Sequence, residues 1–189
     1  MEAFLQARRG NTVMIGDTGV GKTLVSIMLL RDIHQRNPRA AVGTKDVEEK
    51  LWSRVRTMTG LKTVSLVGRD LDLVGAAEMQ RELLAHEILV MTPGAFLNLL
   101  HRGRDYITLD RVLALVFDEC HQARKRHPYA RIMGFYSRTA AMCGRAPLVF
   151  GMTASPMAET ETVLKARAFI CEADSDDIVQ VRCKERGPE

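Results

Sequence analysis

The feature that most constrains the fold of this chain is a glycine-rich segment between two apolar runs, Gly16-Asp-Thr-Gly-Val-Gly-Lys-Thr23. The run before it, Thr12–Ile15, has the length and character of a short buried strand. The run after it, Leu24–Gln35, is so densely apolar that it predicts a helix buried on most sides. A strand, a glycine-rich turn and a helix in this order form the first unit of an α/β fold.

The same segment matches the pattern G-x-x-x-x-G-K-[ST], for which there is a physical reason. Glycines let main-chain N–H groups converge on phosphate oxygens, and the following helix directs its positive end at the same anion. Lys22 would add charge beside the outer phosphates, and the Thr23 hydroxyl would bind Mg²⁺. A glycine-rich turn that binds nothing is the plainer alternative. The predicted nucleotide-binding residues are Gly16, Asp17, Thr18, Gly19, Val20, Gly21, Lys22 and Thr23.

Short apolar runs alternate with helical patterns along the rest of the chain. This alternation predicts an α/β domain with a mostly parallel sheet flanked by helices on both faces. Further strands are predicted at Leu61–Val67, Glu87–Met91, Val112–Phe117 and Pro147–Phe150. Amphipathic helices are predicted at Val47–Met58, Ala76–Ala85 and Ala95–His101, the last preceded by a cap and a proline at Thr92-Pro93.

The strand predicted at Val112–Phe117 runs directly into the sequence Asp118-Glu-Cys-His121. An α/β sheet binds its ligands at the carboxyl ends of its strands, so two acids at this point suit a metal–nucleotide site. Asp118 would hold Mg²⁺ and Glu119 would orient or deprotonate an attacking water. A solvated acidic turn is the plainer alternative.

Composition limits the function classes without choosing one. The net charge of +4 and the pI of about 9.0 suit a phosphate-rich partner, but also a mildly basic surface with no such partner. No apolar stretch approaches the roughly 18–20 residues that span a bilayer, and the N-terminal residues lack a secretory core. The cysteines at 120, 143, 171 and 183 have no metal-ligand spacing. They are typical of reduced thiols in an intracellular protein, cytoplasmic or nuclear.

Together with the phosphate-binding loop, Asp118-Glu-Cys-His121 resembles the DExD/H-box (superfamily 2) helicases, and among them the DECH-box branch of Dicer and the antiviral RNA sensors. Thr92-Pro93-Gly94 resembles the motif that contacts the RNA backbone in this family. Gly151–Pro156 resembles its T-A-S-P motif, and His127–Met133 is similar to Dicer helicase regions in particular. The resemblance covers roughly residues 10 to 160, with the motifs in the family's order.

The resemblance implies a RecA-like, ATP-binding helicase domain over residues 1–160, followed by a C-terminal helix and polar tail over 161–189. It implies ATP and Mg²⁺ as cofactors, double-stranded RNA as partner and RNA silencing as the setting. His121 also has a plainer reading, as a surface residue beside an acidic turn. The implied roles are catalysis for Asp118, Glu119 and His121; Mg²⁺ binding for Thr23 and Asp118; coupling for Thr153, Ala154 and Ser155; and RNA contact for Thr92, Pro93 and Gly94.

One departure from the family pattern concerns the sheet. The family has a buried strand and an RNA-contacting motif after the first helix, but here Pro38–Lys45 runs almost at once into Asp46. Only Ala40-Ala41-Val42 resembles that strand. The sheet is therefore expected to lack this central strand or to keep a remnant of it, which would leave a gap in hydrogen bonding and packing.

Other departures concern the ends of the chain. The adenine-reading glutamine motif would fall before Met1, and Gln6 lies too close to the loop to replace it. The second RecA-like lobe and the ribonuclease domains of a full Dicer have no counterpart after residue 160. The expectation is a chain that binds nucleotide better than it hydrolyses it and does not unwind RNA processively. A helix near 160–170 and then poorly ordered chain are expected in the tail.

Three classes of function stay open on the sequence. The first is the ATP-binding lobe of a Dicer-like RNA helicase, which couples ATP to the handling of double-stranded RNA. The second is a degenerate, non-catalytic module that binds nucleotide or RNA. The third is a small P-loop NTPase or kinase, which would need an arginine-bearing lid that the motifs do not predict. The basic run Arg124–His127 fits either RNA phosphates or a solvated face.

Overall fold

Every strand pair of the sheet in this computed structural model is parallel, as the alternation of strands and helices predicts. The structure describes residues 2–37, 41–44, 49–68, 75–123, 126–153 and 179–182. The sheet order is β3-β4-β2-β5-β6-β1-β7. The strands are β1 (Thr12–Ile15), β2 (Ala41–Thr44), β3 (Thr63–Leu66), β4 (Ile88–Met91), β5 (Ala114–Phe117), β6 (Leu148–Thr153) and β7 (Val179–Arg182).

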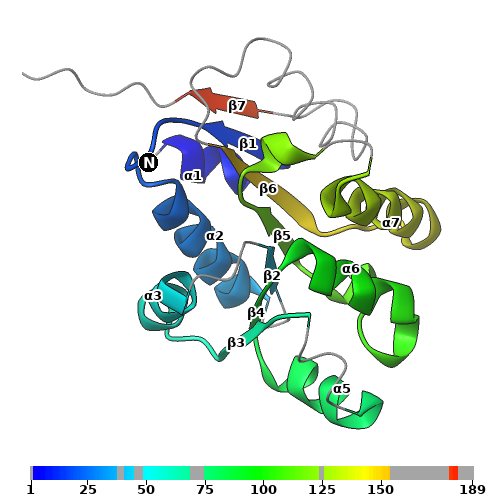
Figure 1. Ribbon diagram of the computed structural model, residues 1–189. Coiled ribbons are helices and arrows are strands. Elements are labelled where there is room, and N and C mark those ends of the chain that lie inside the picture. The colour runs from blue at the N-terminus through cyan, green and yellow to red at the C-terminus, as the bar shows by residue number, and fades with distance from the viewer. Residues whose placement is uncertain are drawn as a thin grey trace, which may run out of the picture.

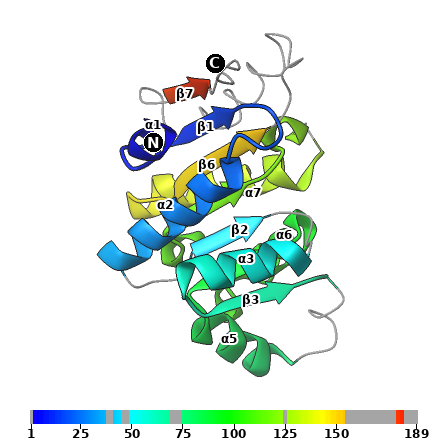
Figure 2. The same cartoon turned by 90° about the vertical axis from the view of Figure 1, so that its left-hand side faces the viewer.

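Six helices cover the sheet within the described part of the chain. They are α1 (Glu2–Ala7), α2 (Lys22–Arg36), α3 (Glu49–Thr59), α5 (Ala76–Ala85), α6 (Pro93–Arg102) and α7 (Pro128–Cys143). Figures 1 and 2 show α1, α2 and α3 on one face and α5, α6 and α7 on the other. None of these helices is long and apolar enough to cross a membrane.

The two faces divide the side chains of each strand between two cores. Leu89 and Met91 of β4 belong to the core under α5, α6 and α7, whereas Ile88 and Val90 belong to the core under α1, α2 and α3. Successive side chains of a strand point to opposite faces, so a strand buried on both sides needs apolar residues at every position. This requirement explains why the sequence shows short continuous apolar runs instead of an alternating pattern.

The structure confirms the predicted strands and the helices predicted between residues 24 and 101, with their ends shifted by a few residues. Helix α7 is absent from the sequence-based prediction. Its start follows ordinary rules, because His127 caps it and Pro128 occupies the first turn. Helix α1 and three short 3₁₀ turns, η1 (Gly103–Asp105), η2 (Leu109–Arg111) and η3 (Cys120–Gln122), are also additions.

Of the two alternatives left open for the central strand, its absence is wrong, and a short strand that includes Ala41 and Val42 is what the structure contains. Strand β2 is present and lies in the middle of the sheet, where it pairs with β4 on one side and β5 on the other. Four residues are enough because β1, β3, β4 and β5 are also four residues long. The sequence underrates this strand since Ala41 and Gly43 have weak strand propensity. The sheet is continuous, so the predicted gap in hydrogen bonding does not arise.

The tail is also corrected in part. It was expected to end in poorly ordered chain, but Val179–Arg182 forms the edge strand β7, which pairs with β1 over its whole length. Figure 1 shows this strand beside β1, although the two are far apart in the sequence. The helix predicted near 160–170 lies outside the described residues.

The parallel register brings the ends of the strands to one edge of the sheet. Ile15 of β1 pairs with Thr153 of β6, and Phe117 of β5 pairs with Gly151 of the same strand. Met91 of β4 pairs with Thr44 of β2. The turns that follow these strands, which carry the sequence motifs, therefore emerge at the same carboxyl edge.

Candidate nucleotide site

The glycine-rich loop leaves β1 and enters α2 at this carboxyl edge. Gly19 and Gly21 have φ angles of 95° and 89°, in the left-handed region where glycine is favoured because it lacks a Cβ. Gly21 is the residue that precedes the first turn of α2. The main-chain N–H groups at the start of this helix therefore face the loop, which is the arrangement that binds anions in proteins.

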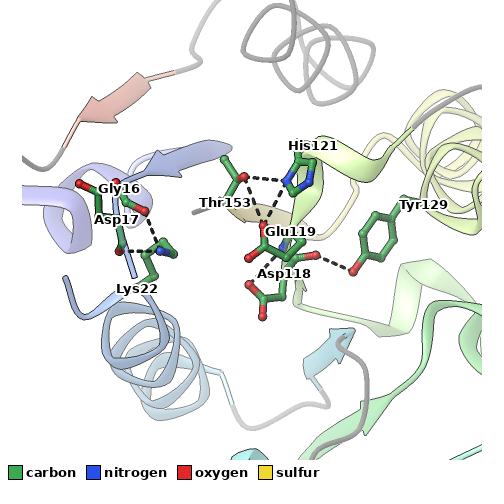
Figure 3. Close-up of polar contacts among 8 residues, drawn as sticks. All are labelled: Gly16, Asp17, Lys22, Asp118, Glu119, His121, Tyr129 and Thr153. Carbon is green, nitrogen blue, oxygen red and sulfur yellow. Dashed lines mark hydrogen bonds and ion pairs between the residues drawn. The ribbon is translucent and has the colours of Figure 1, made fainter. Parts of the chain in front are cut away.

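Lys22 folds back over the loop. Its Nζ donates hydrogen bonds to the main-chain oxygens of Gly16 at 2.7 Å and of Asp17 at 2.8 Å (Figure 3). Gly16 in turn donates its N–H to the Thr153 oxygen at 3.2 Å, which ties the start of the loop to β6. The ammonium group is thus held above the helix N-terminus, where it adds positive charge to that of the main-chain N–H groups.

Two acids follow β5 at the same edge. Asp118 is buried, and one of its carboxylate oxygens accepts the N–H of Glu119 at 3.1 Å. Glu119 has φ 48° and ψ 45°, and it is the only residue other than glycine with positive φ in the described part of the chain. A non-glycine residue in this region costs roughly 1–3 kcal/mol, and such strain concentrates at functional sites.

A hydrogen-bonded cluster connects this turn to the end of β6. His121 Nδ1 lies 2.7 Å from the Thr153 hydroxyl and 3.1 Å from Glu119 Oε2. The Thr153 hydroxyl also donates to Glu119 Oε2 at 3.4 Å. Figure 3 shows the three side chains directed toward one another, with Thr153 on the side of the glycine-rich loop. The Glu119 carboxylate is therefore connected to Thr153 of β6 both directly and through His121.

Cys120, between the acids and His121, has a structural place. It is fully buried and belongs to the core under α5, α6 and α7. Burial raises the pKa of its thiol to about 12, and the nearby charges of Glu119 and Asp118 contribute in the same direction. A thiol with this pKa is neutral at physiological pH and does not act as a nucleophile.

The segment predicted to contact RNA lies at the start of α6. The Thr92 hydroxyl caps this helix by accepting the N–H of Ala95 at 3.3 Å, and Pro93 occupies the first turn. Thr92, Pro93, Gly94, Asp118 and Glu119 are among the residues that line a cavity of about 270 Å³. Residues that the sequence assigns to RNA contact and to metal binding therefore line the same cavity.

The structure brings most of the predicted site residues to the carboxyl edge. The loop, the acids, His121, Thr153 and Thr92–Gly94 all lie there, while Ala154 and Ser155 fall outside the described residues. Sequence reasoning gave no role to Tyr129, whose hydroxyl donates to the main-chain oxygen of Asp118 at 2.7 Å. The only signal was its place in His127–Met133, just after the acidic turn.

A parallel sheet with a G-x-x-x-x-G-K-T loop and an acidic turn at its carboxyl edge defines a RecA-like P-loop domain. The model of the DEAD/DEAH box helicase family matches residues 1–163. The chain belongs to this family.

The relatives and a solved structure agree with this assignment. The chain is 39% identical over 170 residues to Endoribonuclease Dicer homolog 3b of Oryza sativa subsp. japonica, which covers 84% of this chain and 10% of that protein. It is 31% identical over 189 residues to Dicer-like protein 1 of Pyricularia oryzae, which covers 93% of this chain and 12% of that protein. The chain therefore spans about a tenth of the length of these relatives.

The fold is also similar to a known helicase domain. The crystal structure of the Pyrococcus furiosus Hef helicase domain superposes with a TM-score of 0.74 over 95% of this chain and 37% of the Hef chain. The sequences are 22% identical, so this likeness supports the fold alone.

Proposed function

We propose that this chain is the ATP- and Mg²⁺-binding lobe of a Dicer-like RNA helicase that couples ATP binding and hydrolysis to the handling of double-stranded RNA in RNA silencing. The observation that carries the proposal is the contact of Glu119, His121 and Thr153 beside the glycine-rich loop. This contact links an acidic turn suited to nucleotide chemistry with the strand that leads into the motif predicted to couple ATP state to movement.

The nucleotide would lie along the loop, with its phosphates against the start of α2. Lys22 would release its main-chain acceptors and bind the outer phosphates. The Thr23 hydroxyl and the Asp118 carboxylate offer the hard oxygen ligands that Mg²⁺ prefers. Two protein ligands suffice because Mg²⁺ in such sites keeps several waters and binds the phosphates.

In this assignment Glu119 orients the attacking water, and His121 and Thr153 relay the state of the nucleotide. Thr92, Pro93 and Gly94 contact the RNA backbone through the start of α6, where a phosphate meets main-chain N–H groups. A second RecA-like lobe is the proposed partner that supplies arginines to the transition state. Residues Thr153, Ala154 and Ser155 would transmit movement between the lobes, in a cytoplasmic or nuclear protein.

The proposal is tested by nucleotide binding to the purified chain with Mg²⁺, followed with a fluorescent ATP analogue. Lys22→Ala removes the charge from the loop, and we expect its affinity to fall by about tenfold or more, which corresponds to roughly 1.4 kcal/mol. Lys62→Ala is the matched control, because Lys62 precedes β3 at the opposite edge of the sheet. Equal affinity for the analogue in wild type and Lys22→Ala would refute the assignment of the loop.

A degenerate module without catalysis is the second candidate. The strain at Glu119 argues against it, since a turn that is strained but idle would be free to relax. This module is separated from the helicase lobe by ATPase measurement on a longer protein that includes a second lobe. Stimulation of ATP hydrolysis by double-stranded RNA, lost in Glu119→Gln, supports the helicase lobe. Nucleotide binding without any hydrolysis supports the degenerate module.

A further inference from the structure

Tyr129 reaches the acidic turn from outside the known motif. It lies in the first turn of α7, it is 3% exposed, and its hydroxyl donates to the main-chain oxygen of Asp118 at 2.7 Å. Its ring also packs edge-on against Phe117, the residue before Asp118, with centroids 4.8 Å apart. Figure 3 shows the side chain pointing from α7 toward the acids. Tyr129 thus contacts the end of β5 through its ring and the residue that follows β5 through its hydroxyl.

The carbonyl that Tyr129 binds belongs to the peptide unit between Asp118 and Glu119. The N–H of this same peptide donates to the Asp118 carboxylate at 3.1 Å. The peptide is therefore held at both ends, by the phenol at its oxygen and by the acid at its nitrogen. Its orientation determines φ of Glu119, which is 48° and strained. Strained conformations persist only where the surroundings fix them, and the Tyr129 hydroxyl is one such restraint.

Other contacts, independent of the acidic turn, also fix the position of Tyr129. Its N–H donates to His127 Nδ1 at 3.2 Å, which is the capping contact of α7, and the two rings lie 4.7 Å apart. Pro128, between them, sets the first turn of the helix. The hydroxyl therefore reaches Asp118 from a rigid support, and a pre-organised hydrogen bond of this kind loses little entropy when it forms.

We infer that Tyr129 is a positioning residue for the magnesium–nucleotide site, because its hydroxyl holds the Asp118–Glu119 peptide in the orientation that presents the Asp118 carboxylate to Mg²⁺. This inference rests on the proposed function. Tyr129 acts through the main chain and contacts neither metal nor nucleotide. It also lines the cavity shared by Thr92–Gly94 and the acids, so it lies where the RNA-contact segment adjoins the metal site.

The test compares Tyr129→Phe with Tyr136→Phe. Tyr136 lies on the same helix, is 2% exposed, and accepts a hydrogen bond at 3.2 Å from Asn11, which precedes β1 at the amino edge of the sheet. Each variant loses one hydroxyl from a buried, hydrogen-bonded tyrosine and keeps its ring. The affinity for the fluorescent ATP analogue is measured for both with Mg²⁺ and with EDTA, and the melting temperature is recorded.

In Tyr129→Phe we expect the affinity with Mg²⁺ to fall about fivefold, the effect of one hydrogen bond, while the affinity in EDTA stays at the wild-type value. Tyr136→Phe keeps the wild-type affinity in both conditions. An unchanged Mg²⁺ effect in Tyr129→Phe overturns the inference, as does an equal loss with and without Mg²⁺ or a melting temperature far below that of Tyr136→Phe.

The proposed function fails in a different way. If Lys22→Ala binds the analogue as well as wild type, the loop does not bind nucleotide, and both the function and the inference are wrong. If Lys22→Ala loses binding while Tyr129→Phe responds to Mg²⁺ as wild type does, the function stands and only the inference is wrong.

Discussion

The glycine-rich loop and the acidic turn lie at the same edge of the sheet, but different residue types adopt the left-handed backbone conformation in each. Both need a residue with positive φ. The loop uses glycines, with φ of 95° at Gly19 and 89° at Gly21, whereas the turn uses Glu119 at 48°. The loop needs bare main chain that a phosphate can approach, and glycine adopts positive φ there without steric cost. The turn needs a carboxylate, so it keeps the side chain and bears the strain.

The two segments also differ in what holds them. The described hydrogen bonds of Lys22 reach residues five and six positions away in the sequence. Those of the acidic turn reach much farther, to Tyr129 on α7 and to Thr153 on β6. A strained residue without support would relax, so Glu119 depends on these tertiary contacts, whereas Gly19 and Gly21 adopt positive φ without such strain.

The largest effect in this comparison is expected for Gly21→Ala. A Cβ at Gly21 meets no atom within 4 Å, so the cost comes from the left-handed backbone alone, at about 1–2 kcal/mol. We expect a lower melting temperature and weaker binding of the ATP analogue. Gly134→Ala is the control, because this glycine lies inside α7 without positive φ or close contacts. That variant should gain up to about 1 kcal/mol in a denaturant titration.

The two variants should change stability in opposite directions: Gly21→Ala should lower it and Gly134→Ala should raise it. If Gly21→Ala is as stable as wild type, the loop tolerates a side chain, and its difference from the acidic turn disappears.

A smaller effect, about 1 kcal/mol, is expected for Thr153→Val. The substitution keeps the shape of a side chain that is 2% exposed and removes a hydroxyl bonded to His121 and Glu119. Thermal unfolding should shift down by about 2–4 °C, the scale for chains of this size. Affinity for the ATP analogue should stay within about twofold, since the Thr153 hydroxyl bonds the side chains of His121 and Glu119 and not those of the proposed phosphate and Mg²⁺ ligands.

Thr12→Val controls for the loss of a buried threonine hydroxyl, because Thr12 is fully buried in β1 and its hydroxyl donates to the Gly10 oxygen at 3.0 Å. The imidazole NMR signals of His121 should move in Thr153→Val and remain in place in Thr12→Val. Signals that move in both variants would show that the polar cluster is not specific to the acidic turn.

The same contrast explains what the sequence could predict. The loop and the order of motifs were readable because each is encoded in a few adjacent residues with fixed chemistry. The short strand β2 was underrated, since Ala41–Thr44 carries little apolar signal and is recognisable only between β4 and β5. No sequence pattern predicts the contact of Tyr129, because its partner is a main-chain oxygen that any residue could supply.

Buried hydrogen bonds between residues far apart in the sequence are a second feature that the sequence alone does not predict. Asn11 donates to the Tyr136 hydroxyl and accepts the N–H of Val149, so it joins the start of β1 to α7 and β6. A lone asparagine before a strand is typical of a turn. Only the fold shows that it satisfies buried groups far along the chain, as buried polar groups must.

The smallest effect tests the strain at Glu119 directly. Glu119→Ala and Glu119→Gly both remove the carboxylate and its contacts with His121 and Thr153, so they differ only in backbone preference. Alanine bears the left-handed penalty of about 1–2 kcal/mol, while glycine avoids it and loses roughly 0.5–1 kcal/mol through its freedom in the unfolded chain. Glycine should therefore be more stable by about 0.5–1 kcal/mol in urea titrations.

Gly21 and Glu119 both have positive φ, so alanine and glycine should differ in the same direction at the two positions. Gly21→Ala should destabilise the loop, and replacing alanine by glycine at position 119 should stabilise the turn, because both positions have positive φ. If Glu119→Ala equals or exceeds Glu119→Gly in stability, the turn is not left-handed in solution. The Tyr129 hydroxyl would then have no strained peptide to hold, and the acids would owe their orientation to the sheet alone.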